Sequence, residues 1–256
     1  MHSDPAEGKA ALPRVALVTG ASSGIGLATA KKLASMGLHV VACARRMQRL
    51  EALCRELAPA NQRVLPIQVD LRVEGEIAAM FASIRERWGG VDIVVNNAGL
   101  GHSAPLLSGD TASWREILEV NVLALCICTR EAVADMERRG VAGHVIHISS
   151  MSGHRVPRSS GLYSASKHAV RSLTESLRLE LRERNSPIRV SSVSPGFVDT
   201  EFAAHYYKSD DARRTTYQQY RVLQAEDVAE AVAFIITQPS HVQIHDILMR
   251  STEQRM

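Results

Sequence analysis

Short runs of apolar and β-branched residues alternate along the chain with longer stretches in which apolar residues recur every three or four positions. The short runs predict buried strands, and the longer stretches predict helices with one apolar face. The predicted strands are 14–19, 38–43, 64–69, 91–95, 144–148, 188–193 and 246–249. The predicted helices are 24–36, 47–57, 73–88, 113–139, 161–184 and 227–237.

This regular order of strand and helix predicts the fold class. Helices that connect parallel strands cross over in a right-handed sense and cover both faces of the sheet. We therefore expect an α/β protein: a single Rossmann-like, doubly wound domain over 14–256, with a seven-stranded, mostly parallel sheet. Residues 1–13 are expected to form a flexible tail, because no apolar run follows a basic head as in a signal peptide.

One long stretch, 197–224, has a weak hydrophobic pattern. It follows the sixth predicted strand. Ligands of open α/β sheets bind beyond the carboxyl ends of the strands. We predict that this stretch is a lid over a substrate site.

A glycine-rich turn, TGASSGIG at 19–26, joins the first strand to the first helix. Glycines let a backbone approach a pyrophosphate, and the N–H groups at the start of a helix attract it. The predicted cofactor residues of the turn are Gly20, Ser22, Ser23, Gly24, Ile25 and Gly26. The motif alone leaves two alternatives open, a purely structural turn and a G-x-S-x-G nucleophile elbow.

Two arginines indicate which dinucleotide binds. A site for NAD places an acidic residue about 20 positions beyond the glycines, but the chain has none between Glu7 and Glu51. The second strand instead ends at Arg45 and Arg46. Guanidinium groups form charge-assisted hydrogen bonds to phosphate. We predict that the cofactor is NADP(H), with both arginines at its 2′-phosphate.

Tyr163 and Lys167 lie four positions apart on a predicted helix and share one face. A nearby ammonium lowers the pKa of a tyrosine toward neutral pH, where acid–base catalysis is efficient. Ser150 lies just beyond the end of the fifth strand and is predicted to hold a carbonyl oxygen beside Tyr163. Asn121 is a polar amide among apolar residues and needs a partner. These four residues are the predicted catalytic group.

Other chemistries find less support. Ser164 and Lys167 match the S-x-x-K motif of serine acyl-transferases, but the companion motifs are absent. No metal site is predicted, since His144 and His147 on one strand point to opposite faces. The net charge of +3 argues against a nucleic-acid partner, and no run of residues reads as a membrane span. The four cysteines lack a metal or redox spacing, so we expect buried thiols and a cytoplasmic protein.

Together these motifs resemble the short-chain dehydrogenase/reductase family from about residue 14 to 254. The matching pieces are TGASSGIG at 19–26, Asp70, NNAG at 96–99, Asn121, Ser150, YSASK at 163–167, and Pro195-Gly196 followed by Thr200. The stretches 121–132, 150–156 and 246–254 resemble one subgroup, the dehydrogenase/reductase member 11-like proteins, which includes vertebrate keto-steroid reductases and insect farnesol dehydrogenases.

The resemblance implies reversible hydride transfer by a Ser–Tyr–Lys–Asn tetrad. Lys167 would also hold the nicotinamide ribose, and Asn121 would support a water path that reprotonates Tyr163. The further residues implied at the cofactor are Asp70, Leu71, Asn97, Gly99, Pro195, Gly196, Val198 and Thr200.

The substrate expected from these features is a bulky hydrophobic carbonyl compound or alcohol, keto-steroid or isoprenoid-like. The predicted pocket residues are Leu100, Ser150, Met151, His154, Tyr163, Phe197, Phe202, Tyr206 and Tyr207. One alternative is an NADP-dependent 3-hydroxy acid dehydrogenase, for which Arg155 or Arg158 would clamp a carboxylate. A non-catalytic NADP(H)-binding scaffold is an alternative of another class.

The two long helices also predict assembly. They carry more apolar residues than one sheet face needs, so we expect a homodimer or homotetramer. The residues named for this surplus are Leu118, Val122, Leu125, Ala132, Val170, Leu173, Leu177 and Leu181.

Overall fold

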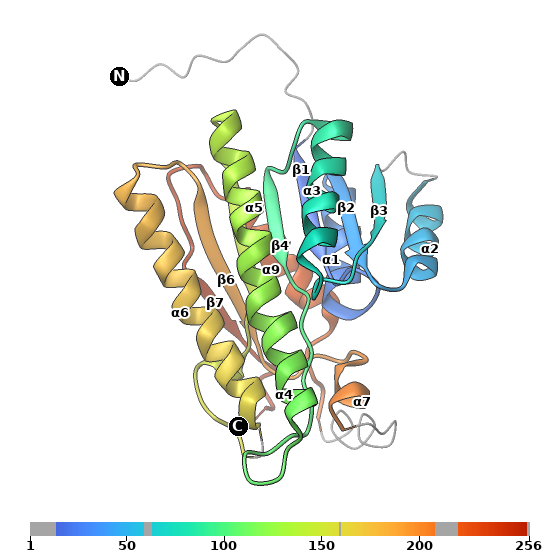
Figure 1. The fold of residues 1–256 in the computed structure, drawn as a ribbon, viewed down its shortest axis with the longest axis vertical. Helices are drawn as coiled ribbons and strands as arrows, with labels where there is room; N and C mark the ends of the chain where they lie inside the picture. The colour runs from blue at the N-terminus through green and yellow to red at the C-terminus, as the bar shows by residue number, and fades with distance from the viewer. Residues whose placement is uncertain (1–13, 59–62, 159, 208–219, 255–256) are drawn as a thin grey trace.

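The computed structural model describes residues 14–58, 63–158, 160–207 and 220–254 (Figure 1). The strands are β1 (Val15–Thr19), β2 (His39–Ala44), β3 (Val64–Gln68), β4 (Ile93–Asn96), β5 (His144–Ile148), β6 (Arg189–Pro195) and β7 (Asp246–Met249). The helices are α1 (Gly24–Ser35), α2 (Met47–Leu57), α3 (Glu74–Trp88), α4 (Thr111–Leu118), α5 (Ala124–Arg139), α6 (Gly161–Glu183), α7 (Phe202–Tyr207) and α9 (Ala225–Thr237). The predicted tail over 1–13 lies outside the described residues.

All seven strands form one sheet in the order β3-β2-β1-β4-β5-β6-β7. Every neighbouring pair is parallel, so the sheet is parallel throughout rather than mostly so. The order reverses between β1 and β4, which is the topological switch point where doubly wound sheets bind ligands. The Rossmann-like prediction is confirmed.

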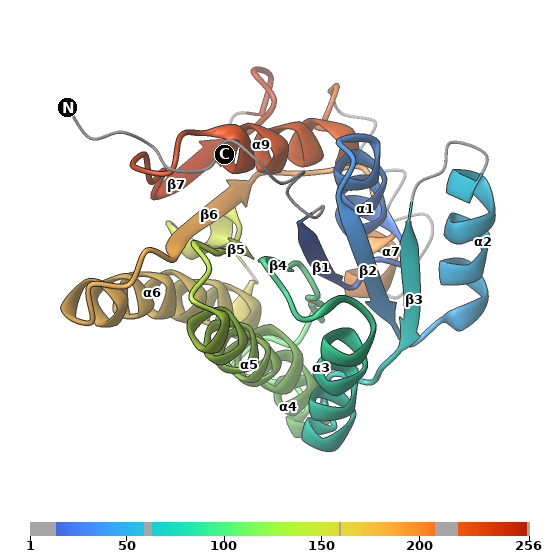
Figure 2. The ribbon, with the colours of Figure 1, turned by 90° about the horizontal axis from the view of Figure 1, so that it is seen from above.

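Helices cover both faces of the sheet (Figure 2). α1 and α9 pack on one face, and α3, α5 and α6 pack on the other. Every residue of β1 and of β5 is buried. Strands covered on both sides need apolar residues at consecutive positions, which explains why they appear as continuous runs in the sequence.

The stretch predicted as one long helix, 113–139, is helical throughout but is not a uniform α-helix. It consists of α4, a π-helical turn over Glu119–Leu123, and α5. Asn121 lies in the π-helical turn and is 1% exposed. The side-chain amide of Asn121 forms hydrogen bonds to groups outside this helix, which are described below. π-helical turns of this kind commonly occur at functional sites.

Smaller differences have local causes. β4 begins at Ile93 rather than at Val91, because the Val91 N–H donates to Asp135 Oδ2 at 2.7 Å instead of to a neighbouring strand. The predicted lid contains a helix that the weak pattern did not predict, α7. Positions 208–219 of that lid lie outside the described residues.

The outer surfaces of the long helices differ from the prediction. Leu125, Ala132, Val170 and Leu181 are buried in the core, so they add nothing to an outer apolar surface. Leu118 is exposed as predicted, and two leucines that were not named, Leu123 and Leu179, are exposed as well. Within the described ranges no helix is long and apolar enough to cross a membrane.

Candidate active site

The glycine-rich turn lies where β1 ends and α1 begins. Gly20 has a φ of +68°, which favours glycine. A Cβ atom on Gly26 would lie 2.4 Å from the Gly20 carbonyl oxygen, so a side chain does not fit there. Ser23 caps α1 without a side-chain hydrogen bond, and the first turn of α1 has no acidic residue. Such a helix start presents N–H groups to an anion, so the turn fits a dinucleotide pyrophosphate.

Asn97 stabilises this turn through hydrogen bonds to Thr19 at the end of β1. Thr19 Oγ1 accepts hydrogen bonds from the backbone N–H groups of Asn97 at 3.0 Å and Ala98 at 2.9 Å. Asn97 Nδ2 donates to the Thr19 carbonyl oxygen at 2.8 Å. The side chain of Asn97 is therefore used to join the ends of β1 and β4.

Other predicted cofactor residues divide into site and core positions. Thr200 lies against the turn, since its Cγ2 would be 2.9 Å from a Cβ atom on Gly24. Leu71 and Val198 are buried, and Ile25 packs partly buried against the core. Pro195 is the last residue of β6, and Gly196 packs against Gln254 and Arg250.

Arg46 connects the turn to a carboxylate from far along the chain. Its Nη2 donates to Ser22 Oγ at 3.0 Å and to Ser23 Oγ at 2.8 Å, while its Nη1 donates to Glu201 Oε2 at 3.0 Å. Arg49 Nη1 donates to the other Glu201 oxygen at 2.6 Å. Although the chain has no acidic residue between Glu7 and Glu51, a carboxylate does lie near the end of β2, because the fold brings in Glu201 from 155 positions away.

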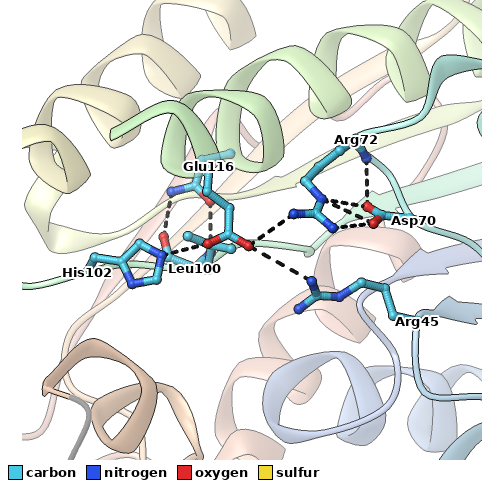
Figure 3. Close-up of polar contacts among 7 residues, drawn as sticks. Arg45, Asp70, Arg72, Leu100, His102 and Glu116 are labelled. Atoms are coloured by element: carbon cyan, nitrogen blue, oxygen red, sulfur yellow. Dashed lines mark hydrogen bonds and ion pairs between the residues drawn. The ribbon is translucent and has the colours of Figure 1, made fainter. Parts of the chain in front are cut away.

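Arg45 lies in a neighbouring charged cluster (Figure 3). Glu116 of α4 sits at its centre, 3.9 Å from Arg45 Nη1 and 3.5 Å from Arg72 Nη1 through Oε1, and 2.8 Å from His102 Nε2 through Oε2. Arg72 Nε also donates to Asp70 Oδ1 at 2.9 Å. These hydrogen bonds from Arg72 lower the pKa of Asp70 to about 2. Two predicted cofactor residues, Arg45 and Asp70, are thus brought together by residues that the sequence pattern did not single out.

Asn121 ties three segments together. Its Oδ1 accepts from the Leu100 N–H at 2.8 Å, and its Nδ2 donates to the Leu100 carbonyl oxygen at 2.8 Å. The same Nδ2 donates to Ser166 Oγ of α6 at 3.0 Å. A Cβ atom on Gly99 would lie 3.4 Å from both Asn121 Oδ1 and Lys167 Nζ. The predicted residues Gly99, Asn121 and Lys167 therefore meet at one point.

Lys167 is buried beside Tyr163. Its Nζ lies 5.9 Å from the centroid of the Tyr163 ring and donates to the Ile148 carbonyl oxygen at 2.9 Å. Burial lowers the pKa of Lys167 to about 8. Ser150 follows β5, and its Oγ accepts from the Ser152 N–H at 3.1 Å. As an acceptor in that bond, the Ser150 hydroxyl keeps its own hydrogen to donate.

Aromatic side chains of α7 pack on the Tyr163 ring. The ring centroids of Phe202 and Tyr206 lie 5.2 Å and 6.2 Å from that of Tyr163. A Cβ atom on Gly101 would lie 2.7 Å from Tyr206 and 2.9 Å from Phe202, so Gly101 makes room for both rings. Sequence reasoning missed Gly101, although a glycine two positions after NNAG is a visible signal. Tyr207 contacts Tyr206 at 4.8 Å between centroids.

The remaining predicted substrate residues lie elsewhere. A hollow of about 360 Å³ is lined by Met151, His154, Arg155, Leu248 and Arg250, without the rings that contact Tyr163. His154 Nε2 lies 3.0 Å from Asp246 Oδ2, and burial lowers the pKa of His154. Phe197 is 42% exposed and makes no ring contact within the described part of the chain.

Metal and thiol chemistry receive no support from these residues. Within the described ranges, no group of three His, Cys, Asp or Glu side chains is arranged to hold a metal ion. Cys43 and Cys128 are buried, and burial raises the pKa of both thiols. Cys54 and Cys126 are half-buried.

Comparison with known proteins agrees with this geometry. The sequence matches the short chain dehydrogenase family over residues 14–211. The human protein "Dehydrogenase/reductase SDR family member 11" is 50% identical over 247 residues, which cover 94% of this chain and 95% of that protein. The farnesol dehydrogenase of Aedes aegypti is 39% identical over 247 residues, covering 94% and 97%.

Solved structures agree as well. The closed form of serine dehydrogenase complexed with NADP+ has a TM-score of 0.89 at 34% identity, covering 94% of this chain and 96% of that one. A short chain dehydrogenase/reductase from Burkholderia phymatum in complex with NAD has a TM-score of 0.83 at 29% identity, covering 92% and 88%. The chain belongs to the short-chain dehydrogenase/reductase family of oxidoreductases. It is related to the member 11 proteins and to farnesol dehydrogenase.

Proposed function

We propose that this protein is an NADP(H)-dependent oxidoreductase that interconverts a carbonyl and an alcohol on a bulky hydrophobic substrate, keto-steroid or isoprenoid-like. The observation that carries the proposal is the buried Lys167 ammonium 5.9 Å from the Tyr163 ring, next to Asn121 and Gly99. The names of the similar human and mosquito proteins and of the NADP+-bound neighbour support it.

Each proposed catalytic residue has a separate task. Tyr163 donates the proton to the carbonyl oxygen during reduction, and Ser150 donates a hydrogen bond that orients this oxygen. The positive charge of Lys167 favours the phenolate of Tyr163 once the proton has left. Asn121 holds the Leu100 loop against α6, and a water path along it would return a proton to Tyr163.

The proposed cofactor site extends from the glycine-rich turn to the end of β2. NADPH supplies the hydride when it is bound. The first turn of α1 would hold the pyrophosphate. Arg45 and Arg46 would bind the 2′-phosphate through charge-assisted hydrogen bonds. Thr200 lies against the turn and would line the cofactor beside it.

The proposed substrate class follows from the rings around Tyr163. Phe202 and Tyr206 form an apolar wall on the proton donor, which suits a large hydrophobic carbonyl compound. The test is the fall in NADPH absorbance with keto-steroids, farnesal, small diketones and 3-oxo acids. We expect turnover of the steroid or isoprenoid carbonyls, and reduction of short 3-oxo acids alone would contradict this substrate class.

A second candidate is a 3-hydroxy acid dehydrogenase, favoured by the two arginines in the hollow beside Met151. Arg155 and Arg250 could bind a substrate carboxylate there. Arg155→Met should then raise the KM for 3-oxo acids, while Arg158→Met serves as the matched control because Arg158 does not line the hollow. Equal KM values in both variants would exclude a carboxylate clamp at Arg155.

Domain limits, assembly and location complete the proposal. We propose one oxidoreductase domain over 14–256 with a lid over 197–224, a homodimer or homotetramer, and a cytoplasmic location. Exposed leucines on the long helices, Leu118, Leu123 and Leu179, support an interface there. Light scattering at micromolar concentration should give the mass of two or four chains, and a monomer mass would contradict the assembly.

A further inference from the structure

Glu201 joins the two halves of the proposed site. It follows Thr200 and directly precedes α7, whose Phe202 ring packs on Tyr163. Its carboxylate accepts hydrogen bonds from Arg46 at 3.0 Å and from Arg49 at 2.6 Å. A carboxylate therefore lies beside the turn and the arginines that would bind a phosphate.

Arg46 divides its donors between this carboxylate and the turn. Its Nε and Nη2 point to Ser22 and Ser23, and its Nη1 points to Glu201. The charge on Glu201 is permanent near neutral pH. Burial alone would raise the pKa of Glu201, but the hydrogen bonds from Arg49 and Arg46 outweigh it and lower the pKa to about 2.

Carboxylates and phosphates are alternative partners for the same guanidinium donors. A 2′-phosphate that approaches Arg46 has to share or displace the bonds of Glu201, and it meets a like charge. NADH carries no phosphate at that position, so it meets neither obstacle.

We propose that Glu201 is a specificity-determining residue that competes with the 2′-phosphate for Arg46 and Arg49, and thereby reduces the preference for NADP(H) over NAD(H). The inference rests on the proposed cofactor site. It names a residue that lies outside both the glycine-rich turn and β2, and it assigns to that residue an effect opposite to that of the arginines.

The test measures the dissociation constants of NADPH and NADH by titrating cofactor fluorescence, without turnover. Glu201→Gln keeps the size of the side chain, and the backbone bond from the His205 N–H to the Glu201 carbonyl oxygen remains. The substitution removes the two partly exposed ion pairs that occupy the arginines, and it also removes the like charge. We expect NADPH to bind about three- to tenfold more tightly and NADH to change less than about twofold.

Glu230→Gln is the matched control. Glu230 on α9 also pairs with a cation, Lys32, at 2.6 Å, but away from the turn. It should change neither dissociation constant. Glu201→Ala removes the same carboxylate and has the same expected result, so the test does not depend on one variant folding.

A second comparison asks whether the effect acts through the arginine. In an Arg46→Met background, Glu201→Gln should tighten NADPH binding less than it does in wild type, because the contested Arg46 donors are gone while Arg49 and the like charge of Glu201 remain. Unchanged or weaker NADPH binding by Glu201→Gln and Glu201→Ala, or equal tightening of both cofactors, would overturn this inference alone. A wild-type protein that binds neither cofactor would overturn the proposed function instead.

Discussion

Burial of the Lys167 amine makes the stability of the folded protein change with pH in the alkaline range. Lys167 is 5% exposed, and burial lowers its pKa from the ordinary 10.5 to about 8. In the unfolded chain the amine keeps its proton up to about pH 10.5. Between these two values the unfolded chain therefore binds more protons than the folded chain. The free energy of unfolding consequently rises with pH across this interval.

The size of the effect follows from the two pKa values. Each pH unit inside the interval contributes up to about 1.4 kcal/mol, and the whole interval contributes roughly 3 kcal/mol. Lys167→Met removes the titrating amine but keeps an apolar side chain of similar reach. The variant also leaves the Ile148 carbonyl oxygen without this donor, which costs the same at every pH.

Urea unfolding of wild type and Lys167→Met between about pH 7.5 and about pH 9.5 measures the difference. The free energy of unfolding of Lys167→Met, relative to that of wild type, should fall by about 1–2 kcal/mol from the lower to the higher pH. Lys31→Met, which removes an exposed amine paired with Glu56 at 2.7 Å, is the control and should follow wild type.

Two buried thiols change the free energy of unfolding with pH in the opposite direction, but they do not affect the difference between wild type and Lys167→Met. Burial raises the pKa of Cys43 to about 12 and raises the pKa of Cys128 as well. Their contribution to stability therefore falls as pH rises through the range where unfolded thiols ionise. Both thiols are present in all three proteins, so they cancel from the difference. Parallel profiles for wild type and Lys167→Met would refute the reasoning about the buried amine.

Three further predictions concern the site. Tyr163→Phe keeps the ring but removes the proton donor, so turnover should fall by roughly 10²–10⁴ while NADPH binding persists; near-normal turnover would remove Tyr163 from the mechanism. Arg45→Asp should raise the dissociation constant of NADPH far more than that of NADH, and an unchanged ratio would move the phosphate contact elsewhere. Gly101→Ala places a Cβ atom 2.7 Å from Tyr206, so KM for a bulky carbonyl compound should rise several-fold; an unaltered KM would show that the rings yield.

The arrangement of elements was largely readable from the order of residues. β5, β7 and α2 begin and end where the hydrophobic pattern predicts. A strand buried on both faces needs a continuous apolar run, and a surface helix needs one apolar stripe, so both can be recognised from neighbouring residues in the sequence. The placing of Tyr163 and Lys167 on one face of α6 is local too, because the pitch of the helix dictates it.

Contacts between distant parts of the chain have no such recognisable pattern in the sequence. Glu201 reaches Arg46 across 155 positions, and Glu116 reaches Arg72 across 44. Neither carboxylate belongs to a motif, and only the meeting of strand ends and loops at one edge of the sheet brings them to the arginines. The π-helical turn at Asn121 has the same origin, since its amide partners come from the loop after β4 and from α6. Periodicity records which face of an element is buried, but side-chain pairing across the sheet edge depends on the folded positions of several elements at once.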